Sequence, residues 1–100
     1  MRKGAAEFAV LSALRGGELY GVELVARLTG AGSVGLSEGT VYPLLRRLQS
    51  DGRLLARWDD TDNGPPRKYY SLTRTGREAV EGMAAFWSEF EAQLNLIVRV

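Results

Sequence analysis

The chain has 100 residues, of which 45% are hydrophobic and 25% are charged, and its formal net charge at pH 7 is only +1. A chain of this length forms one domain with a modest core and has no room for a second. Cysteine and histidine are both absent, which excludes disulfides and thiolate metal sites and removes the usual nucleophile and general base of an enzyme.

Charge is spread unevenly along the chain. Residues 37–77 hold eight basic and five acidic side chains, whereas residues 78–100 hold four glutamates and one arginine. This mild asymmetry places the basic character in the middle of the chain and the acidic character at its end.

No stretch is suited to a membrane or to export. The longest apolar run near the start, residues 8–14, is too short for a membrane span. Arg2 and Lys3 are not followed by a cleavage-type segment. We therefore expect a cytoplasmic protein with no membrane partner.

Two short helices are predicted in the first third of the chain. From residue 4 to residue 15, apolar side chains recur at three-residue steps, which predicts a largely buried helix that ends at Gly16 and Gly17. A second helix is predicted from residue 18 or 20 to residue 28, before a glycine-rich connection. Its expected core stripe is Leu24, Val25 and Leu28.

The stretch LSEGTVYPLLRRLQSDGR, residues 36–53, organises the rest of the chain. Ser37 is placed to cap a helix at its N-terminus, and Gly52 is placed to end it. At 3.6 residues per turn, one face of this helix is apolar and belongs in the core. It comprises Val41, Leu44, Leu45 and Leu48.

The opposite face of this helix lacks the glutamate, lysine and glutamine that a purely solvated surface would carry. It has small and hydroxyl-bearing groups at the N-terminus, followed one turn later by two arginines, which suits close approach to a phosphate backbone and to base edges. The plainer interpretation, an ordinary solvated face whose tyrosine flanks the core, stays open. The DNA-binding candidates on this helix are Ser37, Gly39, Thr40, Tyr42, Arg46 and Arg47.

The period of the pattern changes after Gly52. Alternating side chains predict two strands within residues 54–72, joined by the polar turn DTDNGPP. A hairpin that directly follows the third helix of a small helical unit is a wing. Arg67 and Lys68 at its base can reach phosphates, whereas Asp59, Asp60 and Asp62 would be repelled there. The aromatic side chains expected to pack in the wing and core are Trp58, Tyr69 and Tyr70.

The helical period returns over residues 73–97. Either Thr73 caps this helix or Thr75 does so in a capping box with Glu78. Its apolar side chains recur at alternating steps of three and four, so we expect the helix to pack on a second copy of the chain, together with the first helix. The predicted dimer contacts are Phe8, Leu11, Val80, Met83, Trp87, Phe90, Leu94 and Ile97.

Several of these segments together resemble one known family. They are YGVEL at residues 20–24, GTVYPLLRRLQSDGRL at residues 39–54 and GPPRKYYSLTRTGR at residues 64–77, with Trp58 between the last two. In this order, the chain is similar to the PadR family of bacterial winged-helix transcriptional regulators. Its single C-terminal helix resembles the smaller subgroup of that family.

The resemblance implies dimers, mostly repressors, that bind palindromic operators with the third helix in the major groove and the wing alongside. Carried over to this chain, the DNA-facing positions are Tyr20, Gly39, Thr40, Tyr42, Arg46 and Lys68.

The resemblance also bears on Trp87. In some small family members, tryptophans of the long helices face each other across the dimer axis and sandwich flat hydrophobic drugs. Trp87 lies on the apolar stripe of the last predicted helix, so it is a candidate ligand site for a small aromatic or hydrophobic effector. The plainer interpretation of Trp87 is packing within the dimer interface.

We therefore expect a mainly α fold with a small β-hairpin (α+β). Residues 1–72 would form a winged helix-turn-helix domain with its wing at 54–72, and residues 73–100 a dimerisation helix packed with the first helix of the partner. The leading hypothesis is a homodimeric, ligand-responsive repressor of an inverted-repeat operator in double-stranded DNA. The alternative is a winged-helix module that binds a protein and no operator. We expect no enzyme activity, cofactor or metal.

Overall fold

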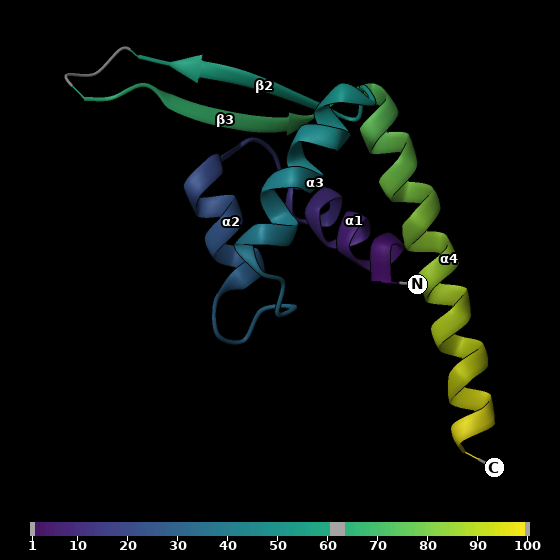
Figure 1. Ribbon diagram of the computed structural model, residues 1–100. Helices are drawn as coiled ribbons and strands as arrows, with labels where there is room; N and C mark the ends of the chain where they lie inside the picture. The colour runs from purple at the N-terminus through teal and green to yellow at the C-terminus, as the bar shows by residue number, and fades with distance from the viewer. Residues whose placement is uncertain (1, 61–63, 100) are drawn as a thin grey trace.

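The computed structural model describes residues 2–60 and 64–99, which form four helices and a three-stranded antiparallel sheet (Figure 1). This arrangement confirms the predicted α+β fold class. The elements in chain order are α1 (Arg2–Ala13), β1 (Leu19–Tyr20), α2 (Gly21–Thr29), α3 (Glu38–Ser50), β2 (Leu54–Asp59), β3 (Arg67–Leu72) and α4 (Arg74–Val98).

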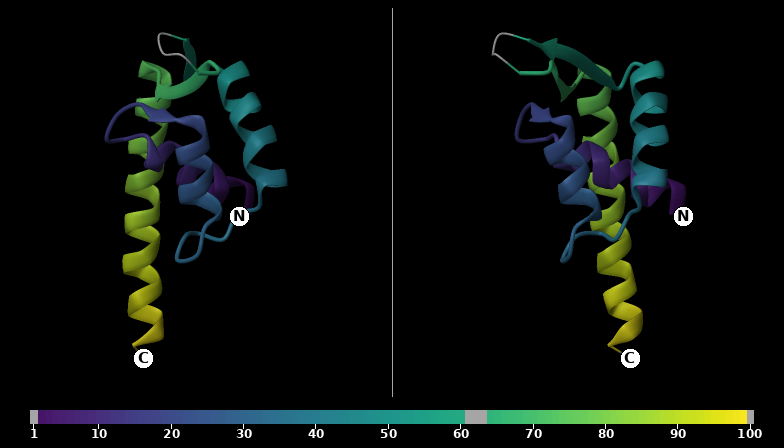
Figure 2. Two further views of the ribbon diagram at one scale, coloured as in Figure 1. Left: turned by 90° about the vertical axis from the view of Figure 1, so that its left-hand side faces the viewer. Right: turned by 60° about the vertical axis from the view of Figure 1, so that its left-hand side comes forward.

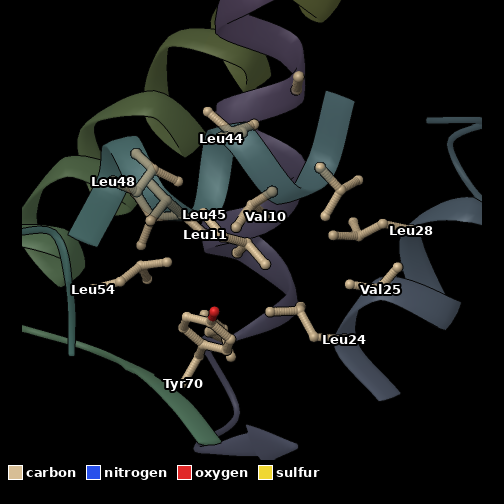
Figure 3. Close-up of a cluster of buried hydrophobic side chains, with 14 residues drawn as sticks. Val10, Leu11, Leu24, Val25, Leu28, Leu44, Leu45, Leu48, Leu54 and Tyr70 are labelled. Atoms are coloured by element: carbon tan, nitrogen blue, oxygen red, sulfur yellow. The ribbon is translucent and has the colours of Figure 1, made fainter. Parts of the chain in front are cut away.

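The core lies where α1, α2 and α3 meet the inner face of the sheet. Figure 3 shows side chains from all three helices pointing at one another, with Leu54 of β2 and Tyr70 of β3 closing the cluster. The apolar stripe predicted for α3 is buried here as expected. The largest fully buried side chains are Val10, Leu11, Leu14, Leu24, Val41, Leu45, Leu48 and Val80.

Both ends of α3 follow from local chemistry. The Ser37 hydroxyl accepts a hydrogen bond from the Thr40 amide at 3.2 Å, which confirms the predicted N-cap. After the C-cap Asp51, Gly52 takes a φ of +78°, a left-handed conformation that favours glycine and turns the chain toward β2.

The predicted hairpin is present as β2 and β3, and a third strand joins it. The order is β1-β3-β2, with Tyr69 paired to both Tyr20 of β1 and Arg57 of β2. Strand β1 has only two residues, which is too short to produce an alternation recognisable in the sequence. Of the predicted turn, Thr61, Asp62 and Asn63 lie outside the described residues.

Helix α4 is capped at its N-terminus by Thr73, whose hydroxyl accepts a hydrogen bond from the Gly76 amide at 3.0 Å. The alternative start, a capping box from Thr75 to Glu78, is therefore wrong. Helix α1 crosses α4 near its middle, where Phe8 meets Trp87, and the C-terminal half of α4 projects beyond every other element (Figures 1 and 2). Among the described residues, no helix is long and apolar enough to span a membrane.

The fold corrects two of the predicted dimer contacts. Leu11 and Val80 are both 0% exposed and belong to the protomer's own core, so neither can touch a partner. In contrast, Phe8, Met83 and Trp87 are half-buried, and the side chains farther along α4 are exposed. The exposed predicted contacts are Phe90, Leu94 and Ile97.

Candidate nucleic-acid interface

The outward face of α3 is open to solvent over its first two turns. Gly39, Thr40, Tyr42 and Arg46 are all exposed. A Cβ built on Gly39 would meet nothing closer than the Ser37 hydroxyl at 3.8 Å, so the backbone itself can come close to a ligand there. Free amides at a helix N-terminus, with the positive end of the helix dipole, favour an anion at this position.

The two arginines of α3 lie in different surroundings. Arg46 is exposed, whereas Arg47 is half-buried and lines an open groove between α3, α1 and Val34. On the other edge of the helix, Tyr42 and Glu38 border a smaller groove beside α2. The outward face therefore has an α1 edge and an α2 edge, with Arg46 outside both grooves.

The predicted DNA-binding cations differ from Arg53 and Arg57 in having no acidic partner. Among the described residues, no carboxylate lies within 4 Å of their charged groups. Arg53, by contrast, pairs with Glu7, and Arg57 pairs with Glu18. Cations without a carboxylate partner keep their charge available for phosphates. They are Arg46, Arg47, Arg67 and Lys68.

On the wing, the structure brings Tyr20 and Arg67 together. The rings of Tyr20 and Tyr69 are 5.7 Å apart between centroids, and the Arg67 guanidinium lies 5.4 Å from the centre of the Tyr20 ring. These side chains share the outer face of the sheet, because residues two apart along a strand point the same way.

Lys68 is not part of this group. It points to the opposite face of the sheet, where its ammonium lies 5.6 Å from the Trp58 ring centre and 5.2 Å from that of Tyr70. The two basic residues predicted for the wing therefore serve different faces.

Two features of the wing were not anticipated. Trp58 was expected to be packed, but it is 65% exposed beside Lys68. The alternating pattern contains no sign of this exposure. The second feature is the Glu18–Arg57 ion pair, a bidentate contact with both distances at 2.7 Å. Its members are 39 residues apart, so no local spacing could have suggested it.

The Glu18–Arg57 pair accounts for the shifted titrations in this region. The hydrogen bond from Arg57 lowers the pKa of the Glu18 carboxyl below its ordinary value, although Asp59 and partial desolvation oppose the shift. The same hydrogen bond raises the pKa of Arg57. Both groups are thus held in their charged forms.

A second, apolar surface runs along α1 and α4. Trp87 stacks on Phe8 with ring centroids 6.2 Å apart and meets Phe90 edge to face at 5.9 Å. These rings border an open groove of about 910 Å³ between α1, the loop after α2, and α4. Farther along α4, three side chains are 69 to 74% exposed: Leu96, Ile97 and Val98. So much uncovered apolar surface at one helix is typical of an interface.

Over residues 2–60 and 64–99, no three histidine, cysteine, aspartate or glutamate side chains are grouped closely enough to hold an ion.

The fold has counterparts among known proteins. Residues 10–82 match the model of a family described as transcriptional regulator, PadR-like. A PadR-like transcription factor from Bacteroides fragilis is 37% identical, with 97% of this chain and 93% of that chain covered and a TM-score of 0.80. A PadR-like transcriptional regulator from Bacillus cereus is 33% identical, with 100% and 97% covered and a TM-score of 0.85.

A third similar structure includes a nucleic acid. It is the PadR protein of Bacillus subtilis in complex with operator DNA, which is 26% identical with a TM-score of 0.63. The match covers 76% of this chain and 43% of that one.

Proposed function

The chain belongs to the PadR-like family of transcriptional regulators, and on that premise we propose that it is a homodimeric, ligand-responsive repressor that binds an inverted-repeat operator. Regulators of transcription are not enzymes, which agrees with the absence of histidine and cysteine from the sequence. The protein would act in the cytoplasm on double-stranded DNA. The B. subtilis relative in complex with operator DNA supports this kind of partner.

The observation that carries the proposal is the composition and exposure of the α3 face. Gly39 and Thr40 leave the N-terminal turn of α3 open, and Arg46 stands exposed nearly two turns later without an acidic partner among the described residues. A surface with this relief fits the major groove, where an arginine can bind a guanine through two hydrogen bonds. Ser37, Tyr42 and Arg47 would flank this contact.

The wing would supply contacts to the backbone of the DNA. Arg67, held over Tyr20, and Lys68, held between two aromatic rings, are preorganised cations at the turn end of a hairpin that projects beyond α2, not at its base as predicted (Figure 1). Such contacts position a protein on DNA without reading its sequence. The winged helix-turn-helix of residues 1–72 would thus be the DNA-binding domain.

Residues 73–100 would form the dimerisation helix. The exposed apolar side chains of α4, with Phe8 of α1, supply the surface that a second copy would cover. A two-fold dimer presents two α3 helices, and half-sites about 34 Å apart would meet both of them.

Trp87 is the proposed contact for a flat aromatic or hydrophobic effector. Its ring borders the groove between α1 and α4, so a ligand stacked there would touch both helices that we assign to the dimer interface. Binding at that position would change the spacing of the two α3 helices and thereby the affinity for the operator.

Fluorescence anisotropy with a random-sequence DNA duplex over a salt series tests the DNA-binding proposal. The logarithm of the association constant should fall linearly with the logarithm of the salt concentration. Arg67→Ala should reduce the magnitude of this slope by roughly one. Arg74→Ala, which removes an exposed arginine at the start of α4, should leave the slope unchanged. Absence of binding at low salt would contradict the proposal and favour a protein partner for the same face.

A further inference from the structure

Five side chains form a continuous ladder across the outer face of the sheet. The Glu18 carboxylate receives two hydrogen bonds from Arg57, and the Arg57 guanidinium lies 4.7 Å from the centre of the Tyr69 ring. Tyr69 contacts Tyr20, which in turn carries the guanidinium of Arg67. The ladder includes side chains from all three strands, since Tyr69 of β3 is paired with both Tyr20 of β1 and Arg57 of β2. Glu18 directly precedes β1.

The two ends of the ladder differ in what they can still bind. Arg57 uses Nε and one terminal nitrogen on Glu18, and another lies 3.7 Å from Asp59. Its guanidinium is therefore committed within the protein. In the part of the chain that the structure describes, the Arg67 guanidinium forms no ion pair, although Asp59 is its cross-strand partner, and it lies over the face of Tyr20. A stacked guanidinium keeps the hydrogen-bond donors at its edge available.

From this asymmetry we propose that Glu18 and Arg57 are positioning residues for DNA binding, which fix Tyr69 and Tyr20 and thereby aim Arg67 at a phosphate. This inference rests on the proposed function, and it assigns a role to an acidic residue in a basic surface. Arg57 and Arg67 are then not equivalent: one orders the face of the sheet and the other contacts the DNA.

The direction in which loss of the Glu18 charge changes the affinity for DNA separates a positioning role from simple electrostatic repulsion. A carboxylate near a polyanion repels it, so loss of the Glu18 charge would by itself strengthen DNA binding. A positioning role predicts the opposite, because loss of the bidentate contact releases Arg57 and allows the two tyrosine rings and Arg67 to move. Glu18→Gln keeps the shape of the side chain and removes the charge-assisted contact.

The experiment measures the affinity of the full chain for a random-sequence DNA duplex. Glu18→Gln should weaken binding roughly 3- to 10-fold, the range usual for a coupled contact, and lower the salt slope. Arg57→Lys keeps the net charge but loses the planar fork, and it should weaken binding as well. In an Arg67→Ala background, Glu18→Gln should bring no further loss.

Glu78→Gln is the matched control, because Glu78 belongs to another exposed glutamate–arginine pair, with Arg74 on α4. It should leave binding unchanged or slightly stronger. Thermal unfolding of each variant establishes that it is folded at the assay temperature.

The outcomes separate the two proposals. If the wild type binds and Glu18→Gln binds equally well or more tightly, the positioning role is wrong and the proposed function stands. If Glu18→Gln lowered the affinity for DNA equally in the wild-type and Arg67→Ala backgrounds, the positioning role would also be wrong. If the wild type binds no duplex at low salt, the proposed function fails and this inference fails with it.

Discussion

Gly76 in the first turn of α4 lies directly against the backbone of Arg53. A Cβ built on Gly76 would be only 2.0 Å from the Arg53 carbonyl oxygen. The same carbonyl accepts a hydrogen bond from the Thr73 amide at 3.2 Å, and the Thr73 hydroxyl donates to the Gly52 carbonyl at 2.6 Å. The contact therefore holds the start of α4, which follows β3, against the turn between α3 and β2, and only glycine permits it.

Gly76→Ala should consequently destabilise the protein. Glycine to alanine in a helix normally stabilises, but here the backbone must move to accommodate the methyl group, at a cost of about 1 to 3 kcal/mol. Urea unfolding at a fixed protein concentration measures the change. Gly82→Ala in the same helix is the control, since a Cβ there meets nothing within 4 Å, and it should stabilise by about 0.5 to 1 kcal/mol.

Arg46→Ala should reduce sequence-specific binding of DNA by about 1 to 3 kcal/mol and relax the preference at one base pair of each half-site. The reason is that the proposed bidentate contact to a base edge is lost. Competition binding with single base-pair variants of a selected duplex measures both effects. Arg74→Ala removes the same charge elsewhere on the chain, so an equal loss in both variants would mean that Arg46 acts only through its charge.

Leu94→Glu should convert the dimer to monomers. A two-fold dimer would bury one copy of Leu94 from each protomer. Loss of both buried side chains should weaken association by roughly 3 kcal/mol, which is about a hundredfold in the dissociation constant. Sedimentation velocity over a concentration series measures the shift. Ala92→Glu places the same charge on an exposed position off the apolar stripe of α4 and should leave the dimer intact. A monomeric wild type would contradict the assignment of α4.

The stabilising effect of Glu18 should depend on pH. Its folded-state pKa is lowered by Arg57 from an ordinary value of 4.5, so the ionised form favours the native state. This contribution is complete above that value and disappears as the pH falls through the folded-state pKa. The difference in unfolding free energy between wild type and Glu18→Gln should therefore shrink as the pH falls below about 4.5. A constant difference would contradict the ion pair.

The parts of the fold that sequence alone predicted are those fixed by local chemistry. The Ser37 cap, the buried stripe of α3 and the hairpin each depend on residues a few positions apart. What escaped prediction depends on contacts between distant segments, such as the Glu18–Arg57 pair and the approach of Gly76 to Arg53.

Periodicity also could not tell which molecule covers an apolar side chain. Leu11 and Val80 fit the stripe of an interface as well as that of a core, and the protomer itself buries both. Trp58 shows the converse. It shares the inner face of the sheet with Leu54, but the hairpin extends past α2, so no helix remains to cover it (Figure 1).

Selection of bound duplexes from a random DNA pool tests the central claim most directly. A dimer that reads DNA with two α3 helices should enrich an inverted repeat whose half-site centres are about 34 Å apart, one turn of the duplex. The enriched sequence should compete far better than the starting pool at physiological salt. Enrichment of no sequence at low salt, or of a single half-site without symmetry, would contradict the account.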